Sequence, residues 1–279
     1  MIPPLLLAIL LPALGALLPW LLKPMRPMRD LFNILVPVGL IAVVLSILPS
    51  ALNGETLEFT IGDLGSGLSF ALALTPLGMI YALVAASLWI LNTIYSYGYM
   101  HGLYGKNFEG QERYWCCFAL AILSAMGIAF SANMLTLFLF YEVMTFSTWP
   151  LVTHTRKPEA KRSGRIYLGI LVGSSTLFML TATLLTWVWT GTLDFREGGI
   201  LSGSTTAGQA AILILLFFFG TGKTAIFPLH QWLPNAMVAP TPVSALLHAV
   251  AVVKAGVFTV LKISTELVGT SVMQGSWGA

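Results

Sequence analysis

FFFGTGKTAIFPLHQWLPNAMVAPTPVSALLH, residues 217–248, is the stretch that decides how this chain folds. It starts as an apolar helix, yet it carries a lysine, Lys223, shortly before a proline, Pro228. Pro228 has no N–H to donate to the carbonyl of Thr224 and its ring clashes there, so the helix must kink or break just after Lys223. Backbone groups freed in a membrane are tolerated only where they are buried in protein or line a wet cavity. The stretch therefore predicts a broken membrane helix beside a buried amine, a pattern that points to an ion or proton pathway.

A structural proline kink, with a lysine that snorkels to the membrane surface, is the alternative explanation of this pattern. The sequence stays mostly apolar past Pro228 as far as Val238, which places Lys223 too deep for easy snorkelling and favours the pathway. Pro234 belongs to the same predicted break, and His230, which lies beyond Pro228, is expected to connect the site to one surface.

The composition is that of a membrane protein. Of 279 residues, 57% are hydrophobic and 9% are charged, whereas a soluble domain carries about 25% charged residues. A hydrocarbon core of ~30 Å needs roughly 20 apolar residues per helix, so the chain is long enough for about eight helices. We expect an all-α polytopic membrane protein with helices near Ile2–Leu22, Leu31–Ser50, Pro76–Tyr97, Tyr114–Ala132, Asn133–Thr153, Ile166–Thr190, Gly208–Phe227 and Pro242–Ser264. Residues 1–75 would hold the first helix pair and a hairpin, and residues 76–279 the remaining helices.

The charges of the connecting loops predict the orientation of the helices. The basic loops contain Lys23, Arg26, Arg29, Lys106, Arg113, Arg156, Lys157, Lys161, Arg162 and Arg165. The alternate loops contain Glu55, Glu58, Asp63, Asp194 and Glu197, with Arg196 as their single basic residue. By the positive-inside rule the basic loops lie in the cytoplasm and the N-terminus lies outside. The first apolar segment has no basic n-region and no small-residue cleavage site, so we expect a retained helix.

The segment Asn53–Leu74 is too polar to span a membrane. It alternates in part between apolar and polar residues on either side of a Gly-Ser-Gly turn, which predicts a small external β-hairpin.

Three ionisable side chains fall inside membrane-length apolar stretches: Glu142, Lys223 and Lys254. One charge at the centre of a bilayer helix costs ~2.5–3.5 kcal/mol, so three unpaired charges would cost on the order of 8–10 kcal/mol. Glu142 lies about halfway along its segment, and Lys223 is its expected partner. The two would form either an ion pair that loses a proton when a nearby charge moves, or an ion pair with a purely structural role.

The segment Pro242–Ser264 offers His248 and Lys254, which are six residues apart and face different sides of an unbroken helix. His248 and Lys254 could serve the same proton path only if the helix is locally unwound or if a chain of water molecules wraps around it. Histidine changes charge most easily near neutral pH, but a hydrogen-bonded core histidine is an equally good interpretation of His248. Lys262 and Glu266 are expected to form an interfacial i,i+4 pair.

No metal, cofactor or nucleic-acid site is expected. No Cys/His spacing suggests haem, iron–sulfur or zinc, and no serine triad is present. Cys116 and Cys117 are adjacent, diverge by about 100° on a helix and are expected to remain two buried thiols. The string GTGKT is no P-loop, because that motif needs a glycine where the chain has Phe217. The formal charge of +3 does not indicate nucleic-acid binding, because the basic residues lie in short loops between apolar stretches.

Two stretches, FLFYEVMTFSTWPLV (138–152) and GTGKTAIFPLHQWLPNAMVAPTPVSALLHAVAVVKAG (220–256), resemble the proton-conducting antiporter-like membrane subunits. That family includes the large membrane subunits of respiratory complex I, subunits A and D of Mrp-type sodium/proton antiporters, and related hydrogenase subunits. The resemblance implies that Glu142 and Lys223 are the pair of the input half-channel. It also implies that His248 and Lys254 pass protons towards the central axis.

Members of this family usually have about fourteen helices arranged around two inverted repeats. This chain ends at Trp277-Gly278-Ala279, just after its eighth predicted helix, so it resembles the first half only. Either a separate chain supplies the second half-channel or the sequence is a truncated form.

The implied function is proton and cation translocation by a subunit of a multisubunit Mrp-type antiporter in the inner (plasma) membrane. Its partners would be other membrane subunits, the lipid bilayer and protons, with sodium as a candidate second ion. A proton-pumping subunit of a complex I-like quinone oxidoreductase or of a membrane-bound hydrogenase is the alternative. A structural half-subunit that transports no ion is a third hypothesis.

Overall fold

The computed structural model describes residues 3–65, 67–105 and 108–275. Of the positions named above, Ile2, the serine of the Gly-Ser-Gly turn, Lys106 and residues 277–279 lie outside these ranges. The described part of the chain is built from helices and one two-stranded sheet, which confirms the predicted fold class.

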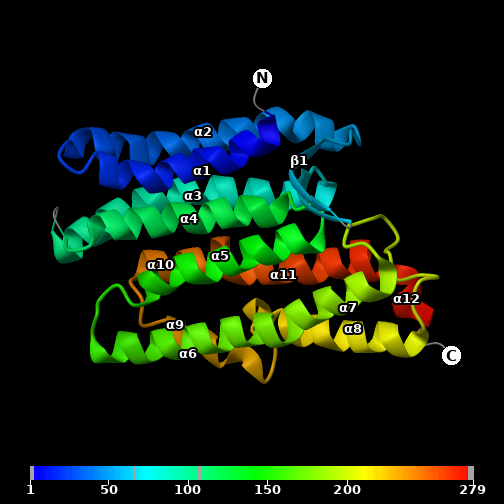
Figure 1. Ribbon diagram of the computed structural model, residues 1–279. Helices are drawn as coiled ribbons and strands as arrows, with labels where there is room; N and C mark the ends of the chain where they lie inside the picture. Colours follow the sequence, from blue (N-terminus) through cyan, green and yellow to red (C-terminus); the bar gives the residue numbers. More distant parts are fainter. Residues whose placement is uncertain (1–2, 66, 106–107, 276–279) are drawn as a thin grey trace.

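Seven helical segments of the described chain are long and apolar enough to cross a membrane, and an eighth, α8 (Ala207–Gly220), is shorter. The seven are α1 (Pro4–Leu21), α2 (Arg26–Leu52), α3 (Pro76–Tyr104), α4 (Gln111–Ala129), α5 (Met134–Val152) and two composite spans, Pro158–Thr190 and Thr241–Val268. All lie roughly side by side, with α1 and α2 on one side, then α3 and α4, then α5 with α10 and α11, and α6 to α9 on the far side (Figure 1).

Both composite spans contain π-helical turns. The first runs through α6 (Pro158–Ser174), η1 (Ser175–Leu180) and α7 (Thr181–Thr190). The second runs through α10 (Thr241–Ala245), η4 (Leu246–Val250), α11 (Val252–Lys262) and η5 (Ile263–Val268). The remaining short elements are η2 (Gly222–Thr224), η3 (Leu229–Gln231), α9 (Trp232–Ala236) and α12 (Thr270–Gly275).

The connecting loops gather at the two ends of the bundle. The connections that follow α1, α3 and α5, which the sequence marks as basic, lie at one end (Figure 1). The hairpin and the connection between α7 and α8, which the sequence marks as acidic, lie at the other end. This matches the alternation that the loop charges predict. Which end faces the cytoplasm stays a prediction.

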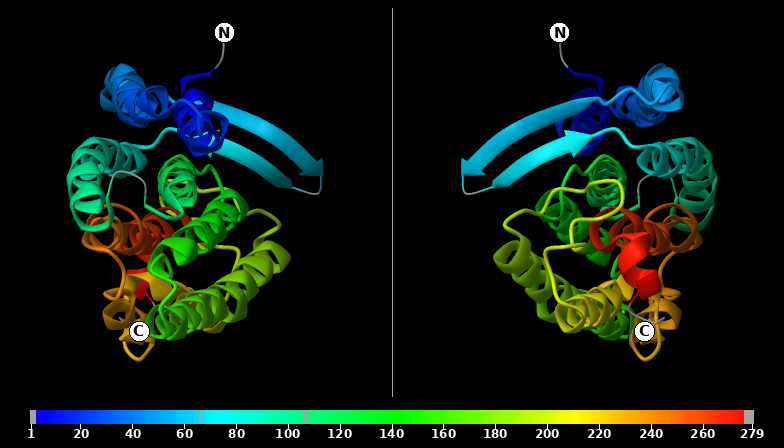
Figure 2. Two further views of the ribbon diagram at one scale, coloured as in Figure 1. Left: turned by 90° about the vertical axis from the view of Figure 1, so that its left-hand side faces the viewer. Right: turned by 90° about the vertical axis from the view of Figure 1, so that its right-hand side faces the viewer.

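The predicted β-hairpin is present. Strand β1 (Glu58–Gly65) pairs antiparallel with β2 (Leu68–Ala73), and the ribbon extends sideways beyond the helices (Figure 2). The N–H of Ala73 donates to the carbonyl of Phe130 at 2.7 Å, so β2 is tied to the turn between α4 and α5.

Asn133 joins the hairpin to the start of α5. Its side-chain oxygen accepts from the N–H of Thr136 at 2.8 Å, which is an N-cap, and its amide donates to the carbonyl of Ser69 at 2.9 Å. Asparagine is favoured at this position because it satisfies an N–H that the helix itself cannot.

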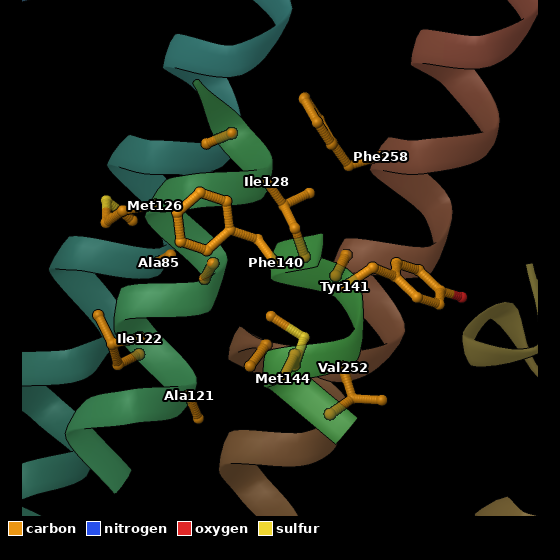
Figure 3. Packing of buried hydrophobic residues seen from close by; sticks show 14 of the residues in the cluster. Ala85, Ala121, Ile122, Met126, Ile128, Phe140, Tyr141, Met144, Val252 and Phe258 are labelled. Atoms are coloured by element: carbon orange, nitrogen blue, oxygen red, sulfur yellow. The ribbon is translucent and has the colours of Figure 1, made fainter. Parts of the chain in front are cut away.

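Helices α4 and α5 form the antiparallel pair that their short connection predicts. Phe140 points from α5 towards Met126 of α4, whereas Tyr141 leaves α5 in the opposite direction (Figure 3). A Cβ atom at Gly127 would lie only 2.2 Å from the Phe140 ring, so the close approach of the two helices requires glycine there. The opposite directions of Phe140 and Tyr141 leave α5 with one face for packing and another for the site described below.

We predict that Gly127→Ala destabilises the protein, because overpacking a tight core position costs about 1–3 kcal/mol. Thermal unfolding in detergent, together with abundance in membranes, measures the effect. Gly98→Ala on α3 is the control: a Cβ there meets nothing within 4 Å, so this change should be neutral or mildly stabilising. An equal loss in both variants would contradict the packing explanation.

Candidate functional site

The break in the apolar helix comes earlier than Pro228 predicts. Helix α8 ends at Gly220, so Lys223 lies beyond the helix end, in the 3₁₀ turn η2, and the expected helix Gly208–Phe227 was too long. Glycines explain the difference. A Cβ at Gly220 would lie 2.5 Å from the backbone nitrogen of Met179, and one at Gly222 would lie 2.2 Å from the hydroxyl oxygen of Ser174. The chain therefore leaves the helix where it passes close against the π-helical region of the neighbouring span.

The carbonyl of Gly222 at the break accepts from the backbone N–H of Ala225 at 3.0 Å and also from a distant side chain. The indole N–H of Trp232, a fully buried residue of α9, donates to the carbonyl of Gly222 at 2.8 Å. The Trp232 ring also lies edge-on against Tyr167 of α6, with 5.6 Å between ring centroids. The short helix beyond the break thus folds back to satisfy the break itself, as buried backbone groups require.

Lys223 is fully buried and points at α5. Its Nζ donates to the carbonyl of Tyr141 at 2.9 Å and to the hydroxyl of Thr145 at 2.6 Å. Nζ also lies 3.3 Å from the centroid of the Tyr141 ring, a cation–π geometry. The backbone N–H of Lys223 donates to the Tyr141 hydroxyl at 3.2 Å. These contacts place the amine inside the bundle, so the snorkelling alternative is wrong.

Glu142 is adjacent to this cluster but makes no direct ion pair with Lys223 among the described residues. Successive residues of a helix point about 100° apart, so Lys223 on the Tyr141–Thr145 side of α5 lies to one side of Glu142. Glu142 is half-buried, and its Oε1 is buried without a hydrogen-bond partner in the described structure. A direct clasp is therefore absent, and Glu142 keeps an acceptor open beside the lysine.

The span that carries His248 is distorted at that residue. His248 lies in the π-turn η4, which ends at Ala251 with φ −110° and ψ −80°. The hydroxyl of Tyr81 donates to the Ala251 carbonyl at 3.2 Å. Nε2 of His248 is buried without a hydrogen-bond partner in the described chain. The local unwinding on which a path through both His248 and Lys254 depends is present.

The other predicted site residues lie on the surface of this chain. Lys254 is exposed on α11, alongside Val257 and Leu261. His230 is exposed and stacks on Phe227, with ring centroids 5.6 Å apart. Pro228 and Pro234 are exposed on the segment between α8 and α10, and the Phe227–Pro228 peptide bond is cis.

Lys262 and Glu266 form the i,i+4 pair that the sequence predicts, and the lysine is buried within the chain. The i,i+4 ion pair is present at 3.4 Å, but the Lys262 side chain is 0% exposed. Its Nζ lies 4.8 Å from the centroid of the Phe195 ring, which comes from the connection between α7 and α8 and covers it. A residue near the end of a predicted helix is buried here because a distant loop folds over it.

The residues that hold Lys223 are not among those predicted from the sequence. Tyr141 and Thr145 were passed over as parts of an apolar helix, as was Thr148, whose hydroxyl lies 2.7 Å from that of Tyr167. The available signal was their spacing: polar residues at i and i+4 share one face of a helix.

Comparison with known proteins agrees with this architecture. The family described as NADH:quinone oxidoreductase/Mrp antiporter, TM, matches residues 131–277, which include the break, Glu142 and both buried lysines. The chain belongs to this family. It is a multi-span membrane protein of the antiporter-like type.

One relative is the Na(+)/H(+) antiporter subunit A1 of Staphylococcus aureus, 29% identical over 238 residues, which are 84% of this chain and 29% of the relative. The solved Mrp complex from Dietzia sp. DQ12-45-1b contains a chain that aligns with a TM-score of 0.79 and 27% identity, over 91% of this chain and 27% of that one. The archaeal membrane-bound sulfane sulfur reductase shares the fold, with a TM-score of 0.79 and 23% identity over 92% of this chain and 52% of that one. This chain thus spans less than a third of the length of that curated relative.

We predict that Thr145→Val destabilises the protein, because it removes a hydroxyl that accepts from the buried Lys223 amine; hydrogen bonds to charged groups contribute about 1.5–3 kcal/mol. Thr145→Ser keeps the acceptor and should stay near the wild type in thermal unfolding. Thr181→Val is the matched control, since that hydroxyl bonds only the carbonyl of Leu177 on an exposed helix face. Equal shifts for Thr145→Val and Thr181→Val would show that the contact to Lys223 contributes nothing.

Proposed function

We propose that this chain is a proton- and cation-translocating membrane subunit of a multisubunit Mrp-type antiporter. The observation that carries the proposal is the fully buried Lys223 at a broken helix, held against α5 beside a half-buried glutamate. Buried ionisable groups in membrane spans are expensive and usually serve ion or proton pathways. The names of the Staphylococcus and Dietzia relatives support the Mrp type.

In this proposal Glu142 and Lys223 are not in direct contact, and the charge of each one changes the proton affinity of the other. Their charges interact strongly because the surroundings have a low dielectric constant. Protonation of Glu142 removes a negative charge beside the lysine and favours release of the lysine proton. The open acceptor on Glu142 and the cluster of Tyr141 and Thr145 around the amine suit such a step.

The proposed relay continues through the distorted span. His248 sits in the π-turn with an unpaired ring nitrogen, and Lys254 lies on the outer face of α11. That face would lie against further protein that supplies the second half-channel. His230, beyond the break, would connect the site to one surface. The exchanged ions would be protons and sodium, and the chain would work in the inner (plasma) membrane with other membrane subunits.

A proton-pumping subunit of a redox-driven complex is the second candidate, because the matched family also includes NADH:quinone oxidoreductase subunits. Purification of the native complex separates the two. Iron–sulfur and flavin subunits among the partners would favour the redox-driven complex, and their absence beside small antiporter subunits would favour the Mrp type.

We predict that Glu142→Gln and Lys223→Ala each reduce sodium-driven proton flux below one tenth of the wild type while the complex still assembles. Flux is measured in everted membrane vesicles with a pH-sensitive dye, and assembly by affinity purification of the complex. Lys157→Ala, which removes an exposed lysine in a loop, is the control and should transport normally. Wild-type flux in either site variant would refute the proposed function.

A further inference from the structure

A polar cavity of about 580 Å³ lies where the hairpin meets the end of α11. Its lining combines carboxylates and cationic side chains from three parts of the fold: Glu58, Asp194, Arg196, Glu197, Lys262 and Glu266. A water molecule occupies about 30 Å³ in the liquid, so the cavity has room for a chain of waters. The excess of acidic over basic groups would concentrate cations there.

Lys262 gives this cavity a buried base. Its side chain is 0% exposed, and its Nζ has Glu266 at 3.4 Å but no hydrogen bond of good geometry among the described residues. An ammonium group has three donors, and a buried ion pair is stable only when the remaining donors are satisfied. Its other near neighbours are aromatic: the rings of Phe195 and Phe258, at 4.8 and 5.7 Å. Lys262 is one of the residues that line the cavity, so a shift of its side chain would bring these donors to water.

Helix α11 links this base to the break. A Cβ at Gly256 would lie 2.5 Å from the backbone nitrogen of Thr224 and 2.7 Å from the carbonyl carbon of Lys223, so α11 presses directly on the broken segment. Lys262 is six residues further along, which is about 9 Å of helix rise.

Thr259 lies between these two positions, one turn from each. It is 0% exposed, and its hydroxyl has no partner in the described chain. A threonine inside a helix often bonds the carbonyl four residues earlier, so an unpaired buried hydroxyl is a free donor and acceptor on this stretch of α11. Two polar groups of α11 that lack a hydrogen-bond partner in the described chain, Thr259 and Lys262, thus lie between its contact with the broken segment and the cavity.

We infer that α11 carries the hairpin-side branch of the ion path: the Lys262–Glu266 pair exchanges protons with water in the cavity, and Thr259 continues the connection to Lys223. This inference rests on the proposed function. The other charged residues that line the cavity with this pair are Asp194, Arg196 and Glu197 on the connection between α7 and α8, and Glu55 and Glu58 at the hairpin. If the pair were only structural, its replacement by apolar residues of similar size would leave the flux unchanged, because such a replacement is often neutral for stability.

The first test uses the whole complex in everted vesicles. The double variant Lys262→Met with Glu266→Leu removes the charges while keeping the volume, and it should assemble yet lose at least nine tenths of the proton flux. The control removes another ion pair, Arg156–Glu109, which is exposed at the opposite end of the bundle. Arg156→Gln with Glu109→Gln should leave the flux unchanged.

Chemical rescue keeps the test decisive if the double variant assembles poorly. In a Cys116→Ser, Cys117→Ser background, Lys262→Cys should be inactive. Reaction with 2-aminoethyl methanethiosulfonate forms a disulfide, releases methanesulfinate and restores an amine, so flux should return. The ethyl reagent without the amine should not restore it. Rescue should occur only when the reagent is supplied at the hairpin side, with free cysteine as scavenger at the other side.

The outcomes separate the two levels of the proposal. Normal flux in the Lys262–Glu266 double variant, or equal rescue by the ethyl reagent or from the opposite side, overturns the inference; if Lys223→Ala is still inactive, the proposed function stands. Normal flux in Lys223→Ala overturns the proposed function itself.

Discussion

A primary amine enclosed in a membrane bundle imposes the constraint on which the rest of this structure depends. Lys223 can be buried only because the carbonyl of Tyr141 and the hydroxyl of Thr145 accept from it and the Tyr141 ring lies under it. The amine reaches α5 because α8 stops at Gly220 and the chain turns inward. Trp232 in turn holds the break, because its indole N–H donates to the carbonyl of Gly222. Each feature supports the next, since an unpaired charge in hydrocarbon is costly.

Close backbone contacts make this arrangement possible. Gly220 and Gly222 let the broken segment lie against the π-helical region of the neighbouring span, and Gly256 lets α11 press on the other side of it. π-Turns often mark functional positions in helices, because they release backbone groups and shift side chains around the axis. Here one π-turn adjoins the break and another contains His248.

The two fully buried lysines occupy different settings. Lys223 is saturated by neutral oxygens and an aromatic ring, with its carboxylate nearby but not in contact. Lys262 has its carboxylate at 3.4 Å and faces a polar cavity. The two identical side chains therefore differ in the groups that surround their amines.

Local chemistry in the sequence was enough to predict the spans, the hairpin, the alternation of the loops between the two ends, the presence of the break and the burial of Lys223, but not the residue at which α8 ends. Hydropathy, loop charge and the missing N–H of proline act over a few residues and can be read from a short window. Contacts between distant segments decided the rest. Lys223 faces Tyr141 and Thr145 instead of Glu142, and Phe195 covers Lys262, because the angle between two helices and the path of a loop follow from how the whole bundle packs.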